Sequence, residues 1–401
     1  MTAPRDPTRT TTTEGAPGGP PLLAIVVAVL GAILLIIGLI LDPRRAAAAY
    51  LAAYMASLAA VLGALAMIMI ARVTAATWFV ALRRQAEQIV ATLPVLAVLF
   101  IPVLLAAHLL YPWTWPDAAL AADVRTAVHA KSSYLDMPFF VVRAVVYWAT
   151  WLVLGEVVRR ASLAQDRGDT PDIERRMRTA SAVGLVAFAL TVTFASFDWM
   201  MSLSPAWYST IYGVQYFAGA MVSALALLAV LVARGRWRGE LPRAVGADHM
   251  HALAKLLLTF VLFWVYIGFS QLIVIWSAEI PAEVTWYVSR MRGGWRALGA
   301  VLVFGHFALP FCALLVRSIK RSTVSMALLG AWLLVMHYLD VYWIIMPSAV
   351  HSSQNAYWMD LGAVMLIAGL CCVTWSIRRR AEPVVAVGDP AVSASLEYTT
   401  A

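Results

Sequence analysis

Long apolar stretches separated by short polar loops dominate the pattern of this sequence. A membrane-spanning helix needs about 20 mainly apolar residues, and ten stretches reach that length: 22–41, 48–71, 88–110, 137–158, 180–202, 210–233, 253–277, 297–316, 324–346 and 357–377. Only helices or closed barrels cross a bilayer, and these runs are too long and too evenly apolar for the alternating strands of a barrel. The pattern therefore predicts an all-α polytopic membrane protein with about ten transmembrane helices.

The two ends of the chain lack this pattern. Residues 1–20 are rich in Thr, Pro and Gly, a composition typical of disorder. No small-residue cleavage site follows the first apolar run, so we expect a retained helix there and not a signal peptide. The predicted organisation is a disordered tail over 1–20, a ten-helix transmembrane domain over 21–378 and a second disordered tail over 379–401.

Arginine and lysine residues are distributed unevenly between the two sides that ten spans define. The loops after the second, fourth, sixth and eighth runs, together with both tails, hold most of them. Because basic residues are retained on the cytoplasmic side, we expect a multi-pass membrane protein with both termini in the cytoplasm. The net charge of +8 is explained by this topology, and we expect no nucleic-acid partner.

Composition narrows the chemistry further. The chain is 62% hydrophobic and 13% charged, whereas a soluble domain is about a quarter charged. The three cysteines lie inside apolar runs and form neither a Cys-x-x-Cys pair nor a haem-attachment motif, so we predict no disulfide scaffold or iron–sulfur cluster. We predict no metal site and no complete catalytic set on this chain.

Ionisable residues inside the spans are the main candidates for function, because a charge in the bilayer is costly. Eight are expected near the outer side, and His337 and Asp340 share one helix face because they are three residues apart. The outer candidates are His108, Arg143, Asp198, Glu279, Glu283, His306, His337 and Asp340. We interpret them as one half of a transmembrane proton path.

A second set of ionisable residues is expected near the inner side. It contains His251 and Lys255 at the start of the seventh span and Glu156 at the end of the fourth. The alternative is structural: Arg143 pairs with Asp198 or Asp340, and Lys255 and Glu156 extend to the membrane surface. The sequence leaves both interpretations open.

The seventh span also offers a candidate quinone site. Such a site needs one or two hydrogen-bonding groups beside an apolar slot, and Tyr266, Ser270, Gln271 and Trp276 would serve. Haem b is a weaker hypothesis for the span histidines His108, His306 and His337, since no helix carries the paired histidines of a di-haem cytochrome.

Several sequence blocks resemble a known family. The longest is 196–213 (SFDWMMSLSPAWYSTIYG). Three more blocks also match: 131–143 (KSSYLDMPFFVVR), 263–271 (FWVYIGFSQ) and 339–347 (LDVYWIIMP). The four blocks occur along the chain in the same order as in that family. The chain resembles the F subunit of bacterial alternative complex III, which belongs to the polysulfide-reductase-type (NrfD-like) membrane subunits. The resemblance covers roughly residues 50–350.

The resemblance implies a location in a bacterial inner membrane, a fold and a set of partners. The fold is two four-helix bundles flanked by one helix at each end, in a complex that oxidises menaquinol or ubiquinol. Haem and iron–sulfur clusters would lie on partner subunits: an iron–sulfur protein, multihaem cytochromes c and an NrfD-like paralogue. This chain would then be a subunit without a metal cofactor, providing a proton path or a quinone-facing surface. Asp198, Lys255, His337 and Asp340 match the proton-path positions, with Arg143 as a charge partner.

One position departs from the family pattern, and two other functions stay open. Arg72 stands where the family pattern has a histidine, which puts an inner-side histidine role there in doubt. The alternatives are a stand-alone secondary transporter and a quinol-binding anchor of another iron–sulfur oxidoreductase. Transporters often show repeats and broken helices in matching halves, whereas Pro94, Pro102 and Pro310 do not lie in matching positions here.

Overall fold

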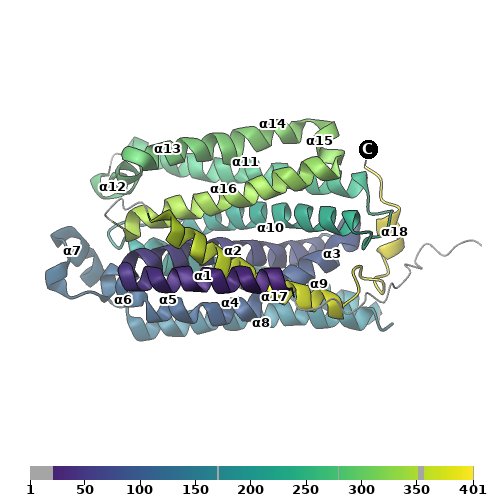
Figure 1. Ribbon diagram of the computed structural model, residues 1–401, viewed down its shortest axis with the longest axis horizontal. Coiled ribbons are helices and arrows are strands. Elements are labelled where there is room, and N and C mark those ends of the chain that lie inside the picture. Colours follow the sequence, from purple (N-terminus) through teal and green to yellow (C-terminus); the bar gives the residue numbers. More distant parts are fainter. Residues whose placement is uncertain (1–20, 169–170, 279, 351–355, 401) are drawn as a thin grey trace, which may run out of the picture.

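The computed structural model describes residues 21–168, 171–278, 280–350 and 356–400, which are 83% helical and contain no strand (Figure 1). The α-helices are α1 (Leu22–Leu41), α2 (Pro43–Val73), α3 (Thr77–Val90), α4 (Leu93–Leu99), α5 (Ile101–Leu105), α6 (Ala107–Leu110), α7 (Ala122–Ala130), α8 (Met137–Gln165), α9 (Pro171–Trp199), α10 (Tyr212–Trp237), α11 (Ala247–Ala278), α12 (Pro281–Arg290), α13 (Gly293–Leu302), α14 (Leu309–Leu315), α15 (Arg317–Arg321), α16 (Thr323–Ala349), α17 (Tyr357–Ala381) and α18 (Val392–Leu396). A π-helical turn, η4 (Val303–Ala308), joins α13 to α14.

The described part of the chain has ten helical segments that are long and apolar enough to cross a membrane. The expected all-α polytopic fold is therefore confirmed. We call the end of the bundle that carries α7 and α12 the outer end, and the end that carries α15 and α18 the inner end (Figure 1). The predicted tail over 1–20 lies outside the described residues.

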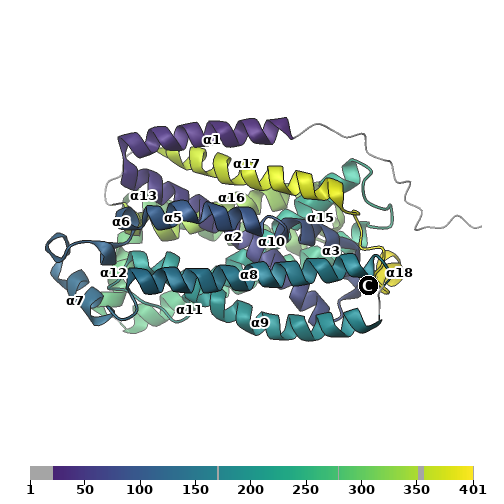
Figure 2. The ribbon, with the colours of Figure 1, turned by 90° about the horizontal axis from the view of Figure 1, so that it is seen from below.

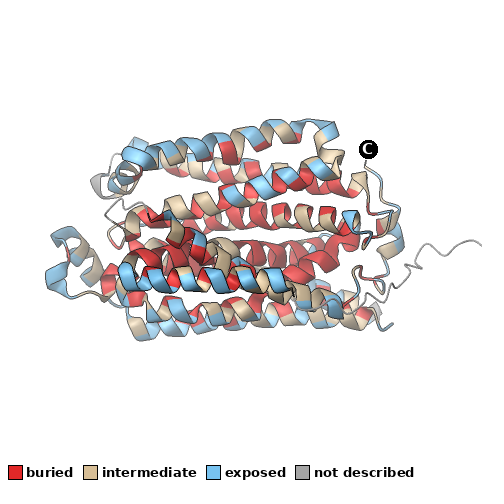
Figure 3. Cartoon of the chain, viewed as in Figure 1, coloured by how far each residue is buried: buried red, intermediate tan, exposed pale blue. Residues whose placement is uncertain are grey.

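The ten spans form two groups. Helices α2, α3, α8 and α9 pack against one another, and α10, α11, α14 and α16 form a second group. The two groups meet where α2 packs on α10, and these two helices are the most buried spans (Figure 3). Helices α1 and α17 lie side by side on the outside of the bundle (Figure 2).

Small residues allow α2 and α10 to approach closely at the centre. A Cβ atom on Gly63 would lie 2.1 Å from the carbonyl oxygen of Ala220, so no larger residue fits at this crossing. Small residues at such crossings let backbones meet and gain van der Waals contact, which is a main source of helix association in lipid. The alanine-rich sequence of α2 serves the same purpose.

The third span begins earlier than the apolar pattern predicts. It starts at Thr77 and runs through α3, α4 and α5 to Leu105, with breaks near Pro94 and Pro102. Proline lacks an N–H group and clashes with the preceding turn, which explains the breaks. As a result, Arg83, which was expected in a loop before residue 88, lies inside α3 and is buried.

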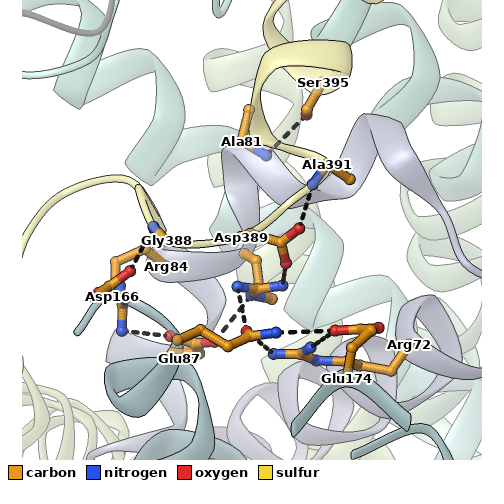
Figure 4. A network of polar contacts seen from close by, with 12 residues as sticks. Arg72, Ala81, Arg84, Glu87, Asp166, Glu174, Gly388, Asp389, Ala391 and Ser395 are labelled. Carbon is orange, nitrogen blue, oxygen red and sulfur yellow. Dashed lines mark hydrogen bonds and ion pairs between the residues drawn. The ribbon is translucent and has the colours of Figure 1, made fainter. Parts of the chain in front are cut away.

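The C-terminal segment corrects another prediction. Helix α17 continues to Ala381, and the chain after it crosses the inner end of the bundle up to Thr400 (Figure 1). Asp389 forms an ion pair with Arg83, and Ser395 Oγ accepts a hydrogen bond of 3.0 Å from the N–H of Ala81 (Figure 4). The expectation of disorder over 379–401 is thus wrong for the residues up to Thr400, because acidic and hydroxyl groups of this segment satisfy buried partners on α3.

Candidate functional site

Asp198, at the outer end of α9, is a fully buried carboxylate with several strong partners. Arg143 on α8 donates from Nε to Oδ2 at 2.8 Å and from Nη2 to Oδ1 at 3.0 Å. The hydroxyl of Tyr147, one turn further along α8, donates to Oδ2 at 2.8 Å. Of the two partners that the sequence allowed for Arg143, the structure selects Asp198. We call Arg143, Tyr147 and Asp198 the Asp198 cluster.

Local sequence positions the arginine of this cluster. Asp136 caps the start of α8 by accepting a hydrogen bond of 3.2 Å from the N–H of Phe139, a typical N-cap contact. The guanidinium carbon of Arg143 then lies 3.9 Å from the ring centroid of Tyr134 and 4.3 Å from that of Phe139. These rings shield one side of the ion pair and hold the guanidinium group in one orientation.

Asp340 on α16 is also buried, but its surroundings are different. Among the described residues its carboxylate accepts one hydrogen bond, from the indole Nε1 of Trp264 on α11 at 3.0 Å. His337 precedes it by one turn, and the ring of His306 from η4 lies 6.5 Å from the ring of His337, centroid to centroid. The ring of Trp264 contacts that of His306 at 4.1 Å. We call Trp264, His306, His337 and Asp340 the Asp340 cluster.

The two histidines of the Asp340 cluster have unused hydrogen-bonding capacity. In the described part of the protein, Nδ1 and Nε2 of both His306 and His337 have no hydrogen-bond partner, although both side chains are buried. Buried polar groups in proteins are nearly always hydrogen-bonded. These nitrogens therefore mark a place where a small polar species, such as water, would be stabilised.

A glycine leaves space for this cluster, and a π-helical turn carries one of its histidines. A Cβ atom on Gly219 of α10 would lie 3.0 Å from His337 Cε1 and 3.2 Å from His337 Nδ1, so glycine leaves room for the imidazole. His306 lies in the π-helical turn η4, and Pro310, four residues later, has no N–H for the carbonyl of His306. Single π-helical turns are common at functional sites in membrane and soluble helices.

A third buried carboxylate was not among the sequence candidates. Asp360 near the start of α17 pairs with Arg45 on α2, and the hydroxyl of Tyr342 lies 3.4 Å from Arg45 Nη2. The pattern placed Arg45 in a loop before the second run, whereas α2 begins at Pro43. This pair joins the flanking helix α17 to the centre of the bundle.

Arg290 closes the outer end of α16. Its Nε donates to the carbonyl of Trp343 at 3.2 Å and its Nη2 to the carbonyl of Ile344 at 2.5 Å. Pro347, four residues after Trp343, cannot donate to that carbonyl, so the arginine replaces the missing helical bond. Burial, without an acidic partner among the described residues, lowers the pKa of the Arg290 guanidinium below its usual value.

The predicted inner set does not come together. Lys255 is exposed on α11, and Glu156 is 43% exposed and accepts a hydrogen bond of 2.6 Å from Arg160. His251 is buried and its Nδ1 lies 3.1 Å from Thr400 Oγ1. Lys255 and Glu156 therefore follow the structural alternative and face the surface, and Glu279 lies outside the described residues.

A different network occupies the inner end (Figure 4). Glu87 on α3 pairs with Arg83 at 3.2 Å and with Arg84 at 2.9 Å, and Arg84 also pairs with Asp166. Arg72, the residue that stands where a histidine was expected, forms an ion pair with Glu174 at 2.6 Å. The apolar pattern could not reveal the network because it placed Arg83, Arg84 and Glu87 before the third span.

The quinone candidates do not line one cleft. Tyr266 and Trp276 lie on the exposed face of α11 and are 64% and 69% exposed. Gln271 is buried and Ser270 is partly buried. Within the described ranges no group of three His, Cys, Asp or Glu residues could hold a metal ion. Tyr266 and Trp276 thus offer a surface for contact and not an enclosed pocket.

No protein-family model matches this sequence, and no curated protein matches it. The observations on this chain itself, namely its helical bundle and its buried polar clusters, are therefore the basis for a functional proposal.

Proposed function

We propose that this chain is a membrane subunit of a respiratory quinol oxidoreductase of the alternative complex III type, and that it contributes a proton path. The multi-pass helical bundle and the sequence blocks described above support this proposal. One observation carries the proton path: among the described residues, the buried carboxylate of Asp340 has a single neutral donor and lies beside two histidines whose ring nitrogens have no partner. Ionisable groups of this kind inside spans are typical of proton relays.

In this proposal Asp340 and His337 hold and exchange a proton, with His306 as the next acceptor. Trp264 orients the carboxylate through its N–H, and Gly219 leaves space beside His337. Along α11, Trp264 and His251 are 13 residues apart, which corresponds to about 20 Å of helix. A proton cannot pass directly over this distance, so transfer to the inner end requires water or a conformational change.

The first experiment tests the subunit. The tagged chain is purified from membranes of its own organism, and the proteins that accompany it are identified together with their haem and iron–sulfur spectra. We expect an iron–sulfur subunit, c-type haem and a second NrfD-like chain. Purification of a lone chain that transports a solute would overturn the proposal.

The second experiment tests the proton path in the intact complex. In liposomes, Asp340→Asn is expected to lower the number of protons moved per electron while quinol oxidation continues. Asp123→Asn, an exposed carboxylate on α7, serves as the control. An unchanged ratio with Asp340→Asn would refute the relay but leave the subunit assignment standing.

A stand-alone secondary transporter is the second candidate. It is favoured by the two interrupted spans, the third at Pro94 and Pro102 and the eighth at η4, because transporters often bind substrate at broken helices. The purification described above separates the two candidates.

A further inference from the structure

A cleft of about 320 Å³ lies at the inner end of the bundle, outside the two aspartate clusters. It lies between the ends of α10 and α17, beside Pro21 at the start of α1. The side chains that define its chemistry are Arg234, Arg238, Trp375, Ser376, Arg379 and Arg380. Because α10 and α17 end here and the apolar sequence of α1 begins here, the cleft lies at the level of the membrane surface.

The charges around the cleft are strongly unbalanced. Glu240 accepts hydrogen bonds from both Arg234, at 3.2 Å, and Arg379. No acidic residue lines the cleft itself within the described residues, and Arg238 has no ion-pair partner among them. One nearby carboxylate, Glu240, therefore faces the guanidinium groups of Arg234, Arg238 and Arg379, which leaves a concentrated positive charge.

Trp375 organises this charge. The guanidinium carbons of Arg234 and Arg379 lie 5.0 and 5.2 Å from its ring centroid, within the range of cation–π attraction. Its indole N–H has no hydrogen-bond partner among the described residues. The arginines are thus held in place on a rigid ring, and a donor beside them is unsatisfied.

The residues next to the cleft indicate the kind of ligand. Leu22 and Leu23 of α1 are 68% and 78% exposed, Trp237 of α10 is 62% exposed and Ile377 of α17 is 57% exposed. A ligand that combines a phosphate with hydrocarbon chains matches both parts of this surface. A guanidinium group can donate two parallel hydrogen bonds to two oxygens of one phosphate. Basic pockets between spans therefore suit anionic lipid headgroups.

We propose that this cleft binds the phosphate group of an anionic phospholipid, with the acyl chains against the exposed apolar residues of α1, α10 and α17. A choline headgroup carries its own positive charge, which the surrounding arginines repel. Each arginine near a membrane surface adds about a fivefold gain in affinity for an anionic lipid. The site is therefore selective for headgroups of net negative charge.

The test uses the full chain, with whatever subunits accompany it, in nanodiscs of phosphatidylcholine with added phosphatidylglycerol. Native mass spectrometry measures the phosphatidylglycerol that stays bound after release from the disc. We expect about fivefold weaker retention with Arg238→Gln, a further loss with Arg238→Gln/Arg379→Gln, and most of the binding restored with Arg238→Lys. Arg317→Gln, an exposed arginine of α15 at the same end, should change nothing.

Three results would overturn the proposal. Equal retention of phosphatidylcholine would remove the selectivity for negative headgroups. Unchanged retention with the double variant would place the lipid elsewhere. Displacement of phosphatidylglycerol by inorganic phosphate at equal concentration would identify a site for free anions. The melting temperature of each variant shows whether a loss of lipid reflects a loss of fold. Because the Arg238 side chain is exposed and unpaired in the described structure, we expect its substitution to leave the fold intact.

Discussion

Asp198 on α9 and Asp340 on α16 are both buried carboxylates on membrane-spanning helices, yet the groups around them differ in kind. Both oxygens of Asp198 accept hydrogen bonds from the guanidinium group of Arg143, and Tyr147 adds a third donor. Asp340 has the indole N–H of Trp264 and no cation within hydrogen-bonding distance in the described structure.

This difference separates a structural role from a functional one. A carboxylate with a bidentate guanidinium partner is neutralised as an ion pair, and moving a proton onto it would leave a buried cation unpaired, at a cost of several kcal/mol. A carboxylate with one neutral donor and two histidines nearby can exchange a proton without breaking an ion pair. In the proposed proton path, Asp340 is therefore the carboxylate that exchanges a proton, and Asp198 fixes α8 against α9.

The largest expected effect is on stability, at the Asp198 cluster. Arg143→Ala leaves a buried carboxylate without its cation, so we expect a loss of about 3–5 kcal/mol in the free energy of unfolding. Asp340→Asn keeps an oxygen that can accept from Trp264, and we expect a loss of less than about 1.5 kcal/mol. Thermal unfolding in one detergent compares them, and an equal loss in both variants would contradict the distinction.

A double variant sharpens this prediction. Arg143→Met with Asp198→Val removes both charges, and the summed side-chain volume of the two residues changes little. Replacing a buried ion pair with apolar residues is often neutral for stability, so the double variant should recover most of the loss seen with Arg143→Ala. A loss as large as in the single variant would mean that the pair has a role beyond neutralising charge.

An intermediate effect is expected at Gly219. The added methyl group of Gly219→Ala would lie 3.0 Å from His337 Cε1, so the imidazole must shift, at a cost of about 1–3 kcal/mol. Gly268→Ala is the matched control, because its nearest neighbour, Gln215, would lie at an ordinary 3.6 Å. We expect proton movement by the complex to fall with Gly219→Ala and to persist with Gly268→Ala.

The apolar pattern was sufficient for the spans because length and hydrophobicity alone decide whether a helix can cross a bilayer. It was insufficient for the start of α3, where Arg83, Arg84 and Glu87 are buried by partners from distant segments. The ordered C-terminal segment was missed for the same reason. Its polar residues gain hydrogen bonds only after the bundle has formed, and composition does not record such contacts.

The candidate site was predictable in part. The depth and spacing of His337 and Asp340 indicated a shared face, and Asp198 was one of two expected partners for Arg143. Trp264 and Gly219 were not singled out as partners of Asp340, because a tryptophan or a glycine in an apolar helix is as typical of packing as of a polar site. His306 was expected in the outer polar set, but its approach to His337 depends on the π-helical backbone of η4.

The smallest expected effect compares the two single donors, Tyr147 and Trp264. Tyr147→Phe removes one of three donors to Asp198, and we expect a loss of about 1 kcal/mol because Arg143 still occupies both oxygens. Trp264→Phe removes the hydrogen bond that Asp340 has in the described structure and leaves a buried acceptor unsatisfied, which costs about 1–3 kcal/mol. A double-mutant cycle of each donor with its aspartate, using Asp198→Ala and Asp340→Ala to remove the acceptor, separates the hydrogen bond from the loss of ring packing. A larger coupling energy for Trp264 with Asp340 than for Tyr147 with Asp198 is expected, and the reverse order would show that the Asp340 carboxylate has stronger partners than its contacts indicate.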